Sequence, residues 1–223
     1  MNLEFLLNLF FPKFCLGCKA EGTYLCEQCF KSFNMCLNQR CARCEKVTGN
    51  GKFCSRICAN GFSFDQLIIC MDYKKTPLLK KIISNYKYNF LKELSGCLIE
   101  MMKFETQRLN IEEYLVVPVP LHKKRMRYRG FNQSLLLAKG LGVDNVCDCI
   151  KRISYNNNQA KLDRAGRLKN LRDNFKVNRN LCGRKVLLID DVATTCSTLN
   201  ECSKALKNAG AKEVCGLVLA RVW

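Results

Sequence analysis

Two aspartates followed by a cluster of hydroxyl side chains are the residues best suited to chemistry in this sequence. In VLLIDDVATTCST, residues 186–198, a short branched apolar run leads into Asp190 and Asp191. The hydroxyl side chains after them are Thr194, Thr195, Ser197 and Thr198. Carboxylates accept hydrogen bonds from sugar hydroxyls or hold magnesium, and hydroxyl groups donate to phosphate oxygens. The pattern therefore predicts a site for a sugar that carries both a phosphate and a diphosphate.

The elements that must position these residues lie on either side of them. Residues 186–189 form a continuous apolar run, which is typical of a strand covered on both faces. Thr198 and Glu201 have capping-box spacing, which predicts the start of a helix, and Gly210 stands where a glycine ends a helix. A second apolar run covers residues 214–220. This strand–loop–helix–strand unit predicts a doubly wound sheet, in which ligands bind beyond the carboxyl ends of the strands.

A basic segment at residues 117–138 supplies groups of the opposite charge. It predicts a strand, a loop that ends at Gly130, and a helix. The basic side chains of the loop are Lys123, Lys124, Arg125, Arg127 and Arg129. Guanidinium groups bind diphosphate oxygens through paired hydrogen bonds, so we expect this loop to face the acidic one. Tyr128 and Phe131 are interleaved with the charges and could stack on bases, whereas His122 is assigned no catalytic role.

A second basic segment covers residues 156–175 and has acidic side chains only at Asp163 and Asp173. Three interpretations are open: a mobile cover over a bound phosphoester, a surface that follows a nucleic-acid backbone, or an ordinary exposed helix. The candidate DNA contacts of the two segments are Lys123, Lys124, Arg127, Tyr128, Arg164 and Arg167.

Cysteines dominate the first 60 residues. Eight of the seventeen cysteines form four close pairs there, three with C-x-x-C spacing and the last with C-x-x-x-C spacing. Thiolate pairs at such spacing hold a tetrahedral metal ion, above all zinc. The simplest assignment is two successive zinc ribbons, one made by Cys15, Cys18, Cys26 and Cys29 and the next by Cys41, Cys44, Cys54 and Cys58.

The residues leave other arrangements of these cysteines open. The pairs could interleave, or only one site could be occupied, because the last pair is irregular. Thiolates also hold iron–sulfur clusters, which an absorbance spectrum distinguishes from zinc. Later cysteines such as Cys97, Cys147 and Cys215 stand in apolar or helical contexts and are expected to pack as small hydrophobic side chains.

Length and charge narrow the remaining possibilities. The chain has 223 residues and a net charge of +18, which favours nucleic acid, phosphorylated metabolites or an acidic membrane surface as partners. Residues 1–14 are mostly apolar but too short to span a bilayer, and are expected to form a helix packed on the body. No later segment is long enough and apolar enough to be a transmembrane helix. The patterns predict a cysteine-rich domain at 1–61 and an α/β domain at 62–223.

Together these segments resemble the ComF (ComFC) family, which joins an N-terminal zinc-ribbon region to a type I phosphoribosyltransferase domain. The resemblance rests on P-V-P-L at 118–121, R-G-F-N-Q at 129–133, a Q-x-x-L-x-R-x-x-R-like segment at 159–167, and D-D-V-x-T-T at 190–195. It implies an α/β fold with a parallel sheet flanked by helices, and a small double zinc-ribbon domain before it.

The resemblance also implies roles for the motif residues. Asp190 and Asp191 would be the catalytic pair, facing the ribose 2′ and 3′ hydroxyls of phosphoribosyl diphosphate (PRPP) bound with magnesium. The residues it implies for PRPP binding are Asp190, Asp191, Val192, Ala193, Thr194, Thr195, Cys196, Ser197 and Thr198. Arg125, Arg129 and Gly130 would belong to the diphosphate loop. Cys196 stands where the family usually has glycine, so we expect it to narrow the pocket or strain the loop.

Two functions fit these implications. The family acts in natural transformation, so the first is the handling of incoming single-stranded DNA by a protein that binds PRPP or a related phosphosugar. A competence helicase and other DNA-uptake proteins would then be its partners. The alternative is an active magnesium-dependent phosphoribosyltransferase of metabolism with no DNA role.

Overall fold

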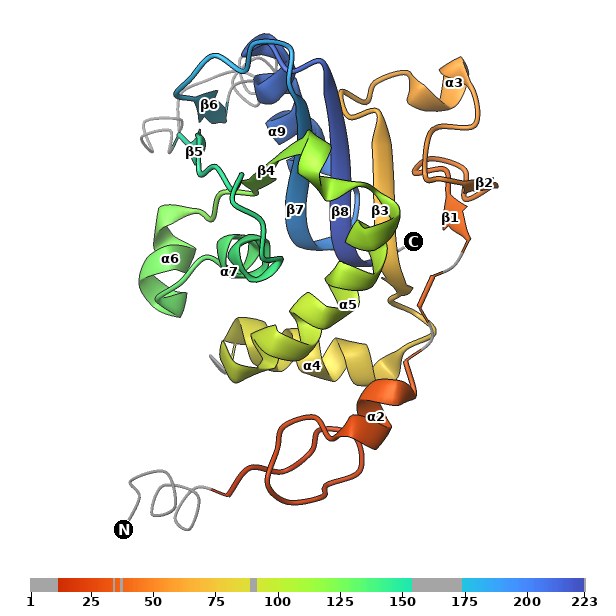
Figure 1. Ribbon diagram of the computed structural model, residues 1–223, viewed down its shortest axis with the longest axis vertical. Helices are drawn as coiled ribbons and strands as arrows, with labels where there is room; N and C mark the ends of the chain where they lie inside the picture. Colours follow the sequence, from red (N-terminus) through yellow and green to blue (C-terminus); the bar gives the residue numbers. More distant parts are fainter. Residues whose placement is uncertain (1–11, 34, 37, 89–91, 154–173, 223) are drawn as a thin grey trace, which may run out of the picture.

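A four-stranded parallel sheet forms the centre of the molecule (Figure 1). The computed structural model describes residues 12–33, 35–36, 38–88, 92–153 and 174–222. The strands of the central sheet are β3 (Gln66–Asp72), β4 (Tyr114–Pro118), β7 (Lys185–Ala193) and β8 (Glu213–Arg221). They lie in the order β3-β8-β7-β4, and each neighbouring pair is parallel. The predicted parallel sheet is confirmed.

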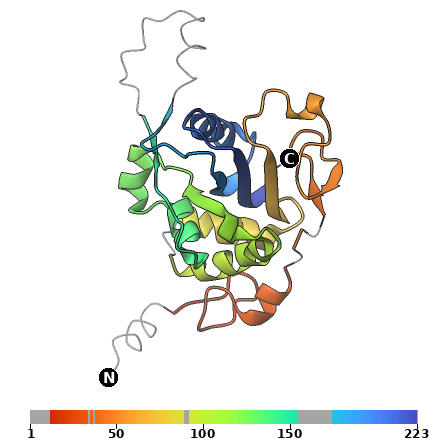
Figure 2. The same cartoon turned by 45° about the horizontal axis from the view of Figure 1, so that its top comes forward.

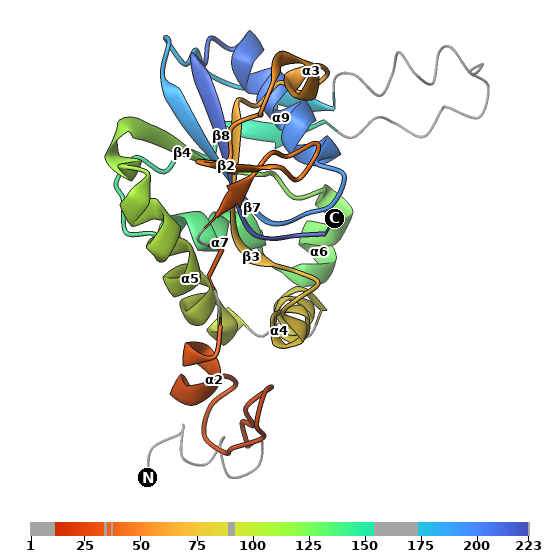
Figure 3. The ribbon, with the colours of Figure 1, turned by 90° about the vertical axis from the view of Figure 1, so that its right-hand side faces the viewer.

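Helices cover both faces of this sheet, as Figure 3 shows edge-on. The longer helices are α4 (Pro77–Tyr88), α5 (Ser95–Arg108), α7 (Gln133–Gly140) and α9 (Ser197–Asn208). Leu187 and Ile189 of β7 pack with α4, α5 and α7, whereas Val186 and Leu188 pack with α9. Alternate residues of one strand therefore pack into two separate cores, because successive side chains of a strand point to opposite faces of the sheet.

Shorter elements connect and extend this body. They are α2 (Glu27–Lys31), β1 (Gln39–Arg40), β2 (Val47–Gly49), α3 (Arg56–Ala59), η1 (Lys92–Leu94), η2 (Ile111–Glu113), α6 (Lys123–Arg129), β5 (Ile150–Arg152) and β6 (Phe175–Val177). β1 pairs with β2, and β5 with β6, each as an antiparallel two-stranded ribbon. No helix in the described part of the chain is long and apolar enough to cross a membrane.

The cysteine-rich residues form two modules that sit against different parts of the body (Figures 1 and 2). The module with α2 packs Leu16 and Phe30 against the core under α4 and α5. The module with β1, β2 and α3 lies along β3, where the Leu67 N–H donates to the Gly51 carbonyl over 3.0 Å. The Gln39 amide there bonds both the N–H and the carbonyl of Ile69, at 2.9 and 3.0 Å. The boundary between residues 61 and 62 stays a prediction.

Two sequence-based expectations fall mostly outside the described residues. The helix expected in residues 1–14 involves residues 1–11, and the basic segment 156–175 includes residues 156–173, which carry Arg164 and Arg167. Their assignments stay predictions.

Candidate functional site

The acid pair lies on a strand, not in the loop where the sequence pattern places it. β7 continues past Ile189 to Ala193 because Asp190, Val192 and Ala193 still pair with β8. The sequence did not predict this extension, because the apolar run ends at Ile189 and two adjacent carboxylates are typical of a turn. As a result, the rigid sheet fixes Asp190 and Asp191 at the carboxyl end of the strand, next to the end of β4.

The loop that follows is short and strained. Cys196 is the residue before α9 and has φ 59° and ψ 10°, the left-handed conformation that glycine adopts most easily. The predicted capping box of Thr198 and Glu201 is wrong, since α9 already begins at Ser197. Gly210, with φ 93°, follows the helix end as predicted. Cys196 is 3% exposed within the core under α9 and does not line the cleft described below, so it strains the loop without narrowing that cleft.

A cleft of about 220 Å³ opens at the carboxyl ends of β4 and β7. The predicted site residues that line it are Asp190, Asp191, Val192, Thr194, Thr198, Arg125 and Arg129. Four others lie outside its lining: Ala193 and Cys196 are buried in the core, and Thr195 and Ser197 are exposed and join their hydroxyls over 2.8 Å. Gly130 is also outside the lining and ends α6 with φ 76°. The acidic strand end and the arginines thus meet in one concave site.

Two further side chains in this cleft hold the carboxylates. The Lys87 ammonium, at the end of α4, lies 2.8 Å from Asp191 Oδ1. The Ser134 hydroxyl, in the first turn of α7, donates to Asp190 Oδ1 over 3.0 Å. No local sequence pattern identifies Lys87, because it is one of several lysines on a helix. Ser134 could have been identified, because it directly follows the R-G-F-N-Q segment. Each of the two acids is therefore positioned by a residue from a different helix.

Burial and a neighbouring charge change the electrostatic state of Asp190. Burial raises the pKa of Asp190 to about 7, and the charge of Asp191 adds to this rise. Hydrogen bonds from the Asp191 N–H and from Ser134, together with the charge of Lys87, only partly oppose it. Asp190 therefore exchanges its proton close to neutral pH, in the range where a carboxylate works as a general base.

We expect Asp190→Asn to stabilise the protein at pH 8. A carboxyl whose pKa is higher in the folded than in the unfolded state makes stability fall as pH rises, here from about 4 to about 7. The variant lacks this loss, so its advantage in free energy of unfolding should grow over that window and reach ~2 kcal/mol above it. This is about half of what the full pKa difference corresponds to, because the carboxyl keeps some solvent contact. Urea unfolding of both proteins at pH 4, 6 and 8 measures it, and a constant difference would contradict the assignment.

The predicted basic loop is a helix. α6 begins after His122, whose Nδ1 accepts a hydrogen bond from the Lys124 N–H over 3.2 Å, and ends at Gly130 in the left-handed conformation. Periodicity could not reveal it, because Met126 is its only aliphatic side chain. Residues 123–128 are all exposed, with Tyr128 at 69%. Phe131 does not join this surface, since it is half-buried with its ring 5.6 Å from that of Tyr86.

Arg129 is the buried member of the basic segment. It is 7% exposed, and its guanidinium stacks over the Tyr88 ring at 5.7 Å. Burial lowers its pKa, although Asp191 opposes the shift. Its Nε has no hydrogen-bond partner among the described residues. A buried, charged donor that lacks an acceptor is costly, and an anion in the cleft would supply one.

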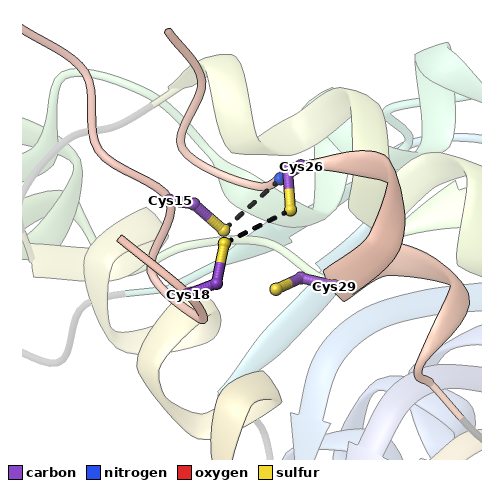
Figure 4. A group of neighbouring side chains, drawn as sticks. All are labelled: Cys15, Cys18, Cys26 and Cys29. Atoms are coloured by element: carbon purple, nitrogen blue, oxygen red, sulfur yellow. Dashed lines mark hydrogen bonds between the residues drawn. The ribbon is translucent and has the colours of Figure 1, made fainter. Parts of the chain in front are cut away.

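Two groups of four cysteines have the geometry of tetrahedral metal sites. The Sγ atoms of each group all lie within 4.8 Å of one another, and the groups are Cys15, Cys18, Cys26 and Cys29, and Cys41, Cys44, Cys54 and Cys58. Figure 4 shows the four side chains of the first group converging on one point. The grouping is the successive arrangement that the spacing predicts, and not the interleaved one.

The donor sets fit zinc. The Sγ–Sγ separations are 3.6 Å for Cys18 and Cys26 and 3.4 Å for Cys44 and Cys54. Four thiolates about 2.3 Å from one zinc ion lie roughly 3.8 Å apart, which is close to these values. The Cys26 N–H also donates to Cys15 Sγ over 3.4 Å. Such backbone donors orient and stabilise metal-bound thiolates.

We expect purified protein to contain about two zinc ions per chain, the capacity of eight thiolates in two tetrahedral sites. Because zinc binding to such sites supplies folding free energy, a strong chelator should unfold the cysteine-rich modules. Metal analysis by mass spectrometry and far-ultraviolet circular dichroism before and after chelation test both statements. A metal-free protein that keeps its full structure would contradict them.

Comparisons with known proteins agree with this architecture. The family model of the phosphoribosyl transferase domain matches residues 130–222, which include α7, β7, α9 and β8. Competence protein ComFC of Streptococcus pneumoniae is 30% identical, over 91% of this chain and 90% of that protein. Competence protein F of Haemophilus influenzae is 28% identical, over 89% and 97%. DNA utilization protein YhgH of Salmonella typhi is 28% identical, over 85% and 87%.

Proposed function

Because the chain belongs to the ComF/ComFC family of competence proteins, we propose that it binds PRPP in the cleft and handles incoming single-stranded DNA along α6. The relatives named as competence proteins and as a DNA utilization protein support a role in DNA uptake. In this proposal the protein works in the cytoplasm, with a competence helicase and other uptake proteins as the partners that the family resemblance suggests.

One observation supports the phosphosugar site most directly: two carboxylates and three arginines line the same cleft at the carboxyl ends of parallel strands. Carboxylates do not attract phosphate, so their presence beside Arg125 and Arg129 favours a ligand with both hydroxyl and phosphate groups. Asp190 and Asp191 would accept hydrogen bonds from ribose hydroxyls, and the arginines would bind the diphosphate. Thr194 and Thr198 would donate to the 5′-phosphate.

The same carboxylates suit magnesium, whose preferred ligands are oxygens. One oxygen of each acid is already engaged, by Lys87 and by Ser134, which leaves the second oxygen of each for a metal that the phosphates also bind. Magnesium would neutralise the diphosphate and make it a better leaving group.

The DNA surface is supported by exposure and charge on α6. Lys123, Lys124 and Arg127 are exposed, and Tyr128 stands among them. A basic track with an exposed aromatic ring binds single strands of any sequence, because phosphates contact the charges and bases stack on the ring. Arg125 lines the cleft and belongs to the same helix, so the two surfaces are contiguous.

A metabolic phosphoribosyltransferase without a DNA role is the second candidate. The pKa of about 7 at Asp190, which burial raises, favours it, since that carboxyl could accept a proton during transfer. Both candidates require PRPP binding with magnesium, and only the first requires DNA binding.

Calorimetry with PRPP, magnesium and a single-stranded oligonucleotide separates the candidates. The proposal expects PRPP binding that depends on magnesium, and oligonucleotide binding that is independent of sequence and weakens steeply with salt. PRPP binding without any oligonucleotide binding at low salt would leave the metabolic enzyme. Competition between the two ligands would mean that the DNA path passes over the cleft.

A further inference from the structure

The second cysteine module shares a hydrophobic core with the loop after β7. Ala42 lies between Cys41 and Cys44 and is 1% exposed. It belongs to the same apolar cluster as Ala193 and Cys196, which stand on either side of Thr194 and Thr195. The metal-binding knuckle, residues 41–44, therefore shares one apolar core with the loop that carries Thr194 to the cleft.

Arg221, at the end of β8, makes a polar link between the same two parts. It is 7% exposed, and its Nη2 donates to the carbonyl oxygen of Ala42. Burial raises the pKa of the Cys196 thiol and the Arg221 charge opposes that rise, so the guanidinium lies close to the loop as well. The next residue, Val222, donates its N–H to the Ala193 carbonyl over 2.9 Å.

Asn200 makes a second, independent link from the first turn of α9. Its Oδ1 accepts from the Ser63 N–H over 2.6 Å, and its Nδ2 donates to the Gly61 carbonyl over 3.2 Å. Residues 61–63 follow the last ligand of the module, and Arg43 ties them to the knuckle through the Cys58 and Asn60 carbonyls. Asn200 and Arg43 therefore connect the first turn of α9 to the knuckle, in addition to the link through Arg221.

The first cysteine module is anchored elsewhere. Lys13 forms an ion pair with Glu93 of η1 at 2.5 Å, and Leu16 and Phe30 pack in the other core, under α4 and α5. Figure 1 shows α2 of this module below α4, whereas β1, β2 and α3 of the second module run beside β3. The two modules therefore provide a comparison within one chain.

From these contacts we infer that Arg221 is a positioning residue for the phosphate loop, and that it couples metal binding by the second cysteine group to ligand affinity in the cleft. The inference rests on the proposed function, because the coupled ligand is PRPP. The left-handed backbone at Cys196 is a costly conformation for a residue other than glycine, and it persists only where neighbouring groups hold it. An ordered knuckle supplies that support through Ala42.

Coupling between two binding sites is reciprocal. Loss of the metal from the second group should weaken PRPP binding by about 10-fold, within the range of about 5- to 150-fold typical of such coupling. PRPP should in turn strengthen zinc binding by that group by the same factor. The first group lacks the link through Ala42 and should show a much smaller effect.

The decisive comparison uses Cys44→Ser and Cys18→Ser, which each remove the second thiol of a C-x-x-C pair. Zinc content, PRPP affinity with magnesium, and hydrogen exchange of the amides of residues 193–199 are measured for both variants and the parent. The inference expects that the loss of affinity and the gain in exchange are about 10-fold larger for Cys44→Ser. Equal effects in the two variants would overturn it.

Variants of Arg221 and Asn200 test the link without touching a thiolate. Arg221→Met should leave two zinc ions bound but weaken PRPP and speed exchange in the loop, and Arg221→Lys, which retains a donor, should recover part of both. Asn200→Ala should act in the same direction and is suited to a helix. If neither Arg221→Met nor Asn200→Ala changes loop exchange, the coupling is absent. A parent that does not bind PRPP overturns the proposed function instead, while the exchange data still decide whether the knuckle supports the loop.

Discussion

Replacing Asp190 and Asp191 together by asparagine is expected to abolish PRPP binding while the fold is kept. Both side chains line the cleft at the end of β7, and asparagine keeps their size but removes their charge. A hydrogen bond to a charged group contributes about 1.5 kcal/mol or more, so losing two should weaken binding at least ~100-fold. Calorimetry of the parent and the double variant, with magnesium and PRPP, measures this.

A control of equal charge change shows whether the effect is local. Glu100→Gln with Asp144→Asn also removes two negative charges, but from exposed side chains outside the cleft. This control should bind PRPP as the parent does. Urea unfolding of the double variant at pH 8 shows whether it remains folded, because Asp191→Asn removes the ion-pair partner of Lys87. An acid-pair variant with parental affinity would mean that the cleft has been assigned to the wrong ligand.

The second large effect is expected at Tyr128. Stacking of a base on an aromatic side chain contributes about 1–3 kcal/mol, so Tyr128→Ala should weaken single-stranded DNA binding by roughly 5- to 150-fold. Tyr128→Phe keeps the ring and should bind nearly as the parent does, which separates stacking from effects of the hydroxyl. Fluorescence anisotropy with labelled oligonucleotides of two unrelated sequences measures both variants.

The charges of α6 should act through the salt dependence instead. Each phosphate contact contributes about 0.7 to the slope of log affinity against log salt for a single strand. Lys123→Ala, Lys124→Ala and Arg127→Ala combined should therefore lower the slope by about 2, whereas Tyr128→Ala should leave it unchanged. DNA binding that none of these changes affects would place the path on another surface.

The fold and the metal groups could be predicted from the sequence because their signals are local. Buried strands and C-x-x-C pairs are defined by neighbouring residues, and both appear where the pattern put them. Short polar elements were harder to predict. α6 lacks apolar periodicity, and β7 extends through Asp190 because it pairs with Val218 of β8, 28 positions away in the sequence.

The contacts that tune the site could not be predicted for the same reason. Lys87 reaches Asp191 across more than a hundred residues, and Arg221 reaches Ala42 across 179. Such pairs depend on how helices and modules pack, and a single sequence contains no pattern for them. The left-handed backbone at Cys196 could be predicted only from the family resemblance, because the family usually has glycine at this position.

The amide of Gln39 gives the cysteine-rich region a further role. β3 is an outer strand of the parallel sheet, and Gln39 bonds the N–H and carbonyl of Ile69 much as a neighbouring strand would. An uncovered outer strand is a template on which other chains assemble by β-pairing, and this one is almost wholly apolar. If this module needs zinc to stay ordered, as we expect from its four thiolates, loss of the metal would uncover the β3 edge and favour self-association.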